Sequence, residues 1–272
     1  MVEKLNKLFS KYAIVIHASW QEHLVYRVNF LLWRFRAMLY LLVLYFLWSS
    51  VFKDQDRLFG YTASTILTYI LGTSIIRSFV LSSQSASVAG EILEGKLSNL
   101  LLRPFSYMGY WFAKDVADKF LNIIFVFLEI SVLLFLLKPP IFIQLNPVIL
   151  LLTLLTVILA LVLYFYLSFL ISLMAFWVRE VWAPRFLIMI LLEFLSGVVF
   201  PLDILPVKLF AFLQFLPFTY LVFFPLKIYL GQLPVAEIWQ GTAILSLWLV
   251  IIYFAAKFVW HRGLRVYAAE GQ

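Results

Sequence analysis

The sequence predicts an all-α membrane protein with six transmembrane helices. Of its 272 residues, 64% are hydrophobic and only 13% are charged, and the mean hydropathy is +1.00. A typical globular domain is about half apolar and a quarter charged, so a soluble domain could not cover this much apolar surface. A series of long apolar runs and one proline-broken apolar stretch also indicate a membrane protein that crosses the bilayer several times.

The apolar runs long enough to cross a bilayer, about 20 residues each, define six predicted spans within one domain of residues 1–272. They are placed at about 30–52, 61–81, 118–137, 147–178, 185–200 and 238–260. Before them, in residues 1–29, apolar side chains recur on one helical face and lysines lie off it. This pattern predicts an amphipathic helix in the membrane interface, or else a solvated helix packed on a partner.

The apolar stretch 201–234, between the fifth and sixth spans, is broken by Pro201, Pro206, Pro217 and Pro225. Proline removes a backbone donor and kinks a helix, and bare lipid does not tolerate broken backbone. We therefore expect two short re-entrant or interfacial helices here rather than a seventh span. Within the fifth span, Ser196 and Gly197 are expected to let neighbouring helices approach closely.

The distribution of lysine and arginine predicts how the chain is oriented in the membrane. With both termini in the cytoplasm, sixteen of the 21 lysines and arginines fall inside. The five outside are Lys53, Arg57, Lys138, Lys208 and Lys227. The positive-inside rule then predicts that both termini are cytoplasmic. It also accounts for the net charge of +7 without a nucleic-acid partner.

Catalytic and metal chemistry have little support. Cysteine is absent, and the three histidines form no H-x-x-x-H pair, so we expect no metal site and no catalytic residues. Residues 90–97 nearly spell the nucleotide-binding loop G-x-x-x-x-G-K-[ST], but Leu97 replaces the Ser or Thr that would reach Mg²⁺. A membrane span, not a strand, precedes the segment. The chain is therefore not expected to bind nucleotide.

The cytoplasmic connection 82–117 contains a predicted amphipathic helix. Its apolar face is formed by Ile92, Leu93, Leu97, Leu100 and Leu101. It ends near Arg103, because a proline disfavours helix in the residue before it. Such a helix either docks into a groove of another protein or lies on the membrane surface, and periodicity alone leaves both open.

The sequence "EILEGKLSNLLLRPFS" at 91–106 resembles the cytoplasmic loop of ABC-2 type transporter permeases, whose I-x-x-G-x-L-x-x-L-L-x-R-P pattern forms the coupling helix. The matching residues are Ile92, Gly95, Leu97, Leu100, Leu101, Arg103 and Pro104. Residues 195–231 resemble the fifth span and re-entrant helices of the same family. Their proline spacing is similar to that of the branch of drug or viologen exporter permeases. The resemblance covers nearly the whole chain.

This resemblance implies a permease subunit that moves substrate out across a bacterial-type plasma (inner) membrane. It is not itself an enzyme and binds no cofactor, because ATP and Mg belong to a separate ABC ATP-binding subunit. A second copy, or a sister permease, would complete the transporter within the membrane lipid. Implied contacts with the ATPase are Glu91, Ile92, Glu94, Gly95, Lys96, Leu97, Leu100, Leu101, Arg103 and Pro104.

Three ionisable residues fall inside the predicted spans. Glu129 and Glu193 lie near mid-span, where they either line a path for a cationic substrate or make interhelical hydrogen bonds. Arg77 lies about one turn from the cytoplasmic end, and we interpret it as snorkelling to the interface.

The outer stretch is rich in aromatic residues and is either an extracellular gate or a lipid-facing surface. The candidate gate residues are Phe200, Pro201, Phe215, Pro217, Phe218 and Tyr220.

Three other classes remain as alternatives. A self-contained secondary transporter would show inverted repeats, and a lipid-modifying enzyme would need a cluster of His, Asp or Glu near one interface. Neither is evident in the sequence. A non-transporting assembly protein is opposed only by the resemblance of the cytoplasmic loop. The substrate, and whether the two permeases are identical, do not follow from the sequence.

Overall fold

The computed structural model describes residues 14–19, 21, 27–103 and 106–267, and these are almost entirely helical. The longer helices are α2 (Arg27–Val51), α3 (Ala63–Phe79), α6 (Tyr107–Leu137), α7 (Pro147–Ser172), α8 (Trp182–Leu195) and α11 (Val235–Val266). The shorter elements are β1 (Arg57–Leu58), β2 (Tyr61–Thr62), η1 (Gln84–Ser87), α4 (Val88–Leu93), α5 (Leu97–Leu101), η2 (Leu173–Phe176), η3 (Leu202–Ile204), α9 (Val207–Leu213), η4 (Pro217–Tyr220) and α10 (Phe223–Tyr229). Most of the amphipathic segment expected at 1–29 lies outside the described residues.

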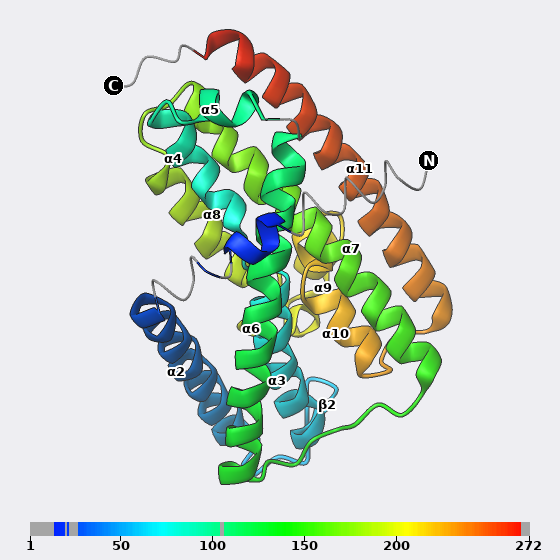
Figure 1. Ribbon diagram of the computed structural model, residues 1–272. Coiled ribbons are helices and arrows are strands. Elements are labelled where there is room, and N and C mark those ends of the chain that lie inside the picture. Colours follow the sequence, from blue (N-terminus) through cyan, green and yellow to red (C-terminus); the bar gives the residue numbers. More distant parts are fainter. Residues whose placement is uncertain (1–13, 20, 22–26, 104–105, 268–272) are drawn as a thin grey trace.

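The helices form one bundle with two distinct ends (Figure 1). The short helices α4 and α5 and the C-terminal end of α11 lie at one end. The antiparallel β1–β2 pair and the extended chain between α6 and α7 lie at the other. Helix α2 packs against α3 at the side of the bundle. Its outward side carries exposed Leu, Phe and Trp side chains, as a lipid-facing helix does.

Four described helices are long and apolar enough to cross a membrane: Val28–Val51, Tyr107–Leu137, Pro147–Phe176 and Val235–Val266. Two bent pairs raise the number to six if each pair counts as one span. They are Ala63–Phe79 with Gln84–Leu93, bent by 44°, and Val207–Leu213 with Pro217–Tyr229, bent by 80°. The chain is therefore an all-α, multi-pass membrane protein with four to six spans.

The fifth expected span, 185–200, has a different form. Helix α8 has 14 residues, or about 21 Å at 1.5 Å per residue, which is shorter than a hydrocarbon core of about 30 Å. It ends because Gly197 adopts a φ of +82°, a common helix-terminating position for glycine. Ser196 and Gly197 thus form the turn after α8 rather than a contact inside a span.

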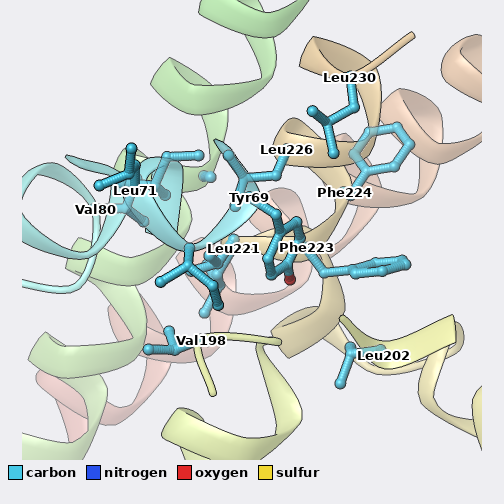
Figure 2. Close-up of a cluster of buried hydrophobic side chains, with 14 of the residues drawn as sticks. Tyr69, Leu71, Val80, Val198, Leu202, Leu221, Phe223, Phe224, Leu226 and Leu230 are labelled. Carbon is cyan, nitrogen blue, oxygen red and sulfur yellow. The ribbon is translucent and has the colours of Figure 1, made fainter. Parts of the chain in front are cut away.

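Gly197 still permits a close approach. A Cβ at this position would lie 2.7 Å from the Tyr69 hydroxyl and 2.9 Å from Phe223 Cβ. Tyr69, on α3, donates a hydrogen bond to the Gly197 carbonyl at 2.6 Å. Figure 2 shows Tyr69 beside Phe223 and Leu226 of α10, in the main hydrophobic core.

The proline-broken stretch forms two short helices, α9 and α10, and α10 lies in the core against α3 and α7. Two glycines make room for it. A Cβ at Gly72 would lie 2.4 Å from Leu226, and one at Gly241 would lie 2.3 Å from the Phe224 ring. Small residues at such contacts let membrane helices pack closely.

Gly241→Ala is expected to destabilise the protein by about 1–3 kcal/mol, because the new methyl group overpacks the contact with Phe224. Thermal unfolding in detergent measures the effect. Gly90→Ala is the matched control, since its added Cβ would come no closer than 3.8 Å to Glu94 and alanine favours a helix over glycine by about 0.5–1 kcal/mol. Equal melting temperatures for the two variants would contradict the packing argument.

Candidate functional site

The connector between α3 and α6, which we define as residues 82–106, contains two short α-helices rather than the single amphipathic helix expected. Helix α4 ends at Leu93 and α5 begins at Leu97. Between them Gly95 has a φ of +72°, a conformation that glycine adopts without steric cost. The helical periodicity through this segment therefore masks a turn at Gly95.

The apolar side chains of the connector point into the protein. Ile92, Leu97 and Leu100 are buried in a second hydrophobic cluster with residues of α6, α7, η2 and α11. Leu97 has no exposed surface. In this structure Leu97 and Leu100 pack within the chain itself, and their expected contact with an ATPase stays a prediction.

A different set of connector residues faces outward. Leu101, the last residue of α5, is 44% exposed, and Leu102, directly after it, is 87% exposed. Glu94 and Lys96, also exposed, form an ion pair with each other. Arg103 is exposed as well, and Pro104 lies outside the described residues. The outward face of the connector is thus mixed, with charged side chains beside two exposed leucines.

Glu91, expected at the ATPase contact, is turned toward the bundle instead. Its carboxylate accepts hydrogen bonds from the Tyr107 hydroxyl at 2.6 Å and from the Trp111 indole N–H at 3.2 Å. Partial burial raises the pKa of the Glu91 carboxyl, and these two donors oppose the rise. Tyr107 in turn stacks on Trp260 of α11, with ring centres 4.8 Å apart. Glu91 therefore ties α4 to α6 and α11.

The start of the connector is also anchored. Asp115 of α6 accepts a hydrogen bond from the Gln84 N–H at 2.8 Å. Ser172 of α7 donates to the Ser85 carbonyl at 2.8 Å and accepts from Arg185 of α8 at 2.8 Å. Side chains of α6 and α7 thus hold the start of the connector, and Ser172 links it indirectly to α8.

Arg34 and Glu129 form a buried ion pair between α2 and α6. Arg34 Nε donates to one Glu129 oxygen at 2.8 Å and Nη2 donates to the other at 2.6 Å. Each side chain is only 9% exposed. Planar, bidentate pairs of this kind are the strongest arginine–carboxylate contacts.

Arg77 of α3 and Glu193 of α8 form a second ion pair. The Tyr40 hydroxyl of α2 donates to the other Glu193 oxygen at 2.9 Å, and the Arg77 guanidinium lies 4.5 Å from the Tyr40 ring centre. Snorkelling therefore does not describe Arg77, since its charge is met by a carboxylate on another helix. Sequence analysis found each charge but had no means of pairing residues so far apart in the chain.

Both ion pairs border one cavity of about 850 Å³. Its walls come from α2, α3, α6 and α8, with residues of the connector and Tyr164 of α7. Arg34, Arg77 and Glu193 line it together with Asp118 and Asn122. Of the two residues expected to form a polar path, Glu193 lines this cavity, whereas Glu129 is connected to it only through Arg34. Both carboxylates are already bound by arginines.

The expected gate residues fall into three groups by exposure. Phe215 is 74% exposed, whereas Pro201, Pro217 and Tyr220 are buried. Tyr220 donates a hydrogen bond to the Gln214 carbonyl at 2.8 Å. The other two, Phe200 and Phe218, are half-buried against the main core.

Sequence analysis missed a polar cluster beside these aromatic residues. Lys227 of α10 lies 2.7 Å from an Asp203 oxygen, and the Tyr61 hydroxyl donates to Asp203 at 3.0 Å. Lys227 also lies 4.9 Å from the Tyr61 ring centre. A lysine within an apolar, proline-broken helix was the available signal for such a partner. The cluster joins α10, η3 and β2.

A comparison with protein families places the chain. The family described as "ABC-2 family transporter protein" matches residues 38–271, and the chain belongs to this family. It is therefore a membrane transport component, of the kind that serves as the permease of an ABC transporter. No curated protein matches it significantly.

Glu129→Gln is expected to destabilise the protein by about 3–5 kcal/mol, because it leaves Arg34 buried without a counter-charge. Thermal unfolding in detergent measures this. The double variant Arg34→Met/Glu129→Leu removes both charges and should recover most of the loss. Lys96→Met breaks an exposed pair and should have no measurable effect. If Glu129→Gln left the stability of the protein almost unchanged, the Arg34–Glu129 pair would not be stabilising.

Proposed function

We propose that this chain is the permease subunit of an ATP-binding cassette exporter, driven by ATP and Mg in a separate ATPase subunit. The observation that carries the proposal is the family match over residues 38–271. We also propose that the chain belongs to the branch of drug or viologen exporter permeases. It would pair with a second, identical or sister permease.

The outward face of the connector is the proposed docking surface for the ATPase. It offers Leu101 and Leu102 as apolar contacts and Glu94, Lys96 and Arg103 as charged ones. Exposed leucines rimmed by charge are typical of a protein contact. The buried leucines and Gly95 then act by holding the shape of the connector.

The attachments of the connector support a coupling role. A displacement of α4 and α5 would act on α6 and α11 through Glu91, Tyr107 and Trp260. It would act on α6 and α7 through Gln84 and Ser85. Motion imposed on the connector by nucleotide-driven closure of the ATPase would thus reach helices that cross the membrane.

In the membrane we propose six crossings with both termini in the cytoplasm of a bacterial-type cell. The connector and the end of α11 lie together at one end of the bundle (Figure 1), which fits a shared cytoplasmic side. Helix α8 would form the fifth crossing, and the broken segment 201–234 would re-enter the membrane from the outer side. The aromatic outer segment with Phe215 would act as the extracellular gate.

The orientation is testable because the natural chain contains no cysteine. Lys96→Cys should react with a membrane-impermeant maleimide only after the membrane is opened. Leu145→Cys, which is at an 83% exposed position in the chain between α6 and α7, should react in intact cells. Labelling of both positions from the same side would refute the proposed topology.

The docking surface is tested by affinity capture of the tagged protein in mild detergent, with mass spectrometry of what it retains. We expect an ATP-binding subunit with the wild type and its loss with Leu102→Asp, because a charge replaces an apolar contact. Leu145→Asp is the matched control, since both leucines are more than 80% exposed and lie at opposite ends of the bundle.

The outcomes distinguish the candidate functions. Retention by the wild type and by Leu145→Asp, but not by Leu102→Asp, supports both the class and the surface. Equal retention by all three proteins would move the ATPase contact away from Leu102. A wild type that retains no ATPase under any condition would contradict the exporter and favour a self-contained transporter.

A further inference from the structure

We propose that the cavity between α2 and the rest of the bundle binds an amphipathic anion, with a carboxylate or phosphate head group and an apolar tail. From the sequence, Glu129 and Glu193 were expected either to line a path for a cationic substrate or to make interhelical hydrogen bonds. The arrangement of charges favours the opposite sign. The inference that this anion is transported rests on the proposed function. Binding of the anion in the cavity does not require an ATPase.

The size and walls of the cavity suit such a molecule. Its volume of about 850 Å³ lies within the range of about 300–1,000 Å³ that is usual for drug-sized ligands. Trp33 of α2 and Phe186, Met189 and Ile190 of α8 supply apolar and aromatic surface. The α3 and α6 sides supply polar and charged groups. The walls are therefore themselves amphipathic.

The carboxylates around the cavity are already engaged. Glu129 is held bidentately by Arg34. One oxygen of Glu193 binds Arg77, and the other binds the Tyr40 hydroxyl. Asp118 accepts a hydrogen bond from Asn122 at 2.8 Å. A cationic ligand would have to displace an arginine to reach Glu129 or Glu193, and breaking a buried pair is costly.

The arginines, by contrast, have donors to spare. Within the described part of the chain, Arg77 donates hydrogen bonds only through Nη2, and its side chain is 24% exposed where it lines the cavity. Arg36 also lines the cavity and is exposed, with its guanidinium 4.7 Å from the Trp33 ring centre. It forms no ion pair with any residue that the structure describes. Guanidinium groups with free N–H donors bind carboxylate and phosphate well.

The test uses the full chain in phosphatidylcholine nanodiscs and a photoreactive dodecanoic acid, with adducts mapped by mass spectrometry. Adducts are expected in α2 and α8. Dodecyl phosphate should compete for labelling, while dodecyltrimethylammonium, with the same tail and the opposite charge, should be at least about tenfold weaker. Equal competition by the cation, or adducts confined to other helices, would overturn the proposal.

Two variants separate the site from general membrane partitioning. Arg36→Gln removes an exposed cation and should weaken labelling about tenfold. Arg262→Gln is its control, because Arg262 is likewise exposed and lies over an aromatic ring, that of Phe258. The neutral pair Arg77→Gln/Glu193→Gln should also weaken labelling. If this double variant fails to fold, the Arg36→Gln variant alone tests the site. Labelling of Arg36→Gln at the same level as the wild type would refute the proposed binding site.

Two further experiments identify the source of the anion. Competition by phosphatidylglycerol added to the nanodiscs would identify a resident lipid and overturn the cargo reading. ATP-dependent movement of dodecanoate, in proteoliposomes that contain the captured ATPase, would identify cargo. Binding that persists without any ATP-dependent movement would refute transport of this anion while leaving the site itself supported.

Discussion

The neutralisation of charge in an apolar bundle is the constraint on which the rest of this structure depends. An arginine or a glutamate at depth in a bilayer is expensive when alone, and in the described part of the chain several buried charges are paired across different elements. Arg34 joins α2 to α6, Arg77 joins α3 to α8, and Lys227 joins α10 to η3. These contacts set which helices are neighbours. The apolar core then packs around them, through glycines that admit α10 between its neighbours.

The same pairing gives α2 an unusual attachment. Much of its surface is exposed and apolar, and it packs mainly on α3. Toward α6 and α8 it is held by the polar side chains Arg34 and Tyr40 beside a cavity, and the Phe30 ring also contacts Phe125 of α6. Farther along the helix, Leu41, Leu44 and Trp48 are buried in the main hydrophobic core. The cavity therefore lies beside the first half of α2, whereas the core packing of this helix lies in its second half.

Much of this architecture could be predicted from sequence, and the shortfalls have physical reasons. Span-length apolar runs located α2, α6, α7 and α11, because length and hydropathy are local properties. The end of α8 was misplaced because a glycine with positive φ looks the same in sequence as a glycine at a helix contact. The connector was taken for one helix because its leucines keep helical spacing across Gly95. The sequence also identified the outward charges of the connector but not which leucines face out.

The sequence could not predict which residues pair when they lie far apart in the chain. Glu129 and Glu193 were recognised as unusual, yet their partners Arg34 and Arg77 lie on other helices, and a single sequence carries no record of which helices adjoin. The cluster of Asp203, Lys227 and Tyr61 was missed for the same reason. The family match, by contrast, spans residues 38–271, because it depends on the pattern of the whole chain rather than on any one contact.

The separation of Arg34 from Glu129 has a consequence for biogenesis. The two residues are 95 positions apart, so at synthesis rates of about 5–20 residues per second the arginine exists for roughly 5–20 s before its carboxylate is made. During that interval the Arg34 side chain in α2 has no Glu129 to pair with, so its charge favours a position near the membrane interface. The buried position of Arg34 is therefore expected only after α6 has been made.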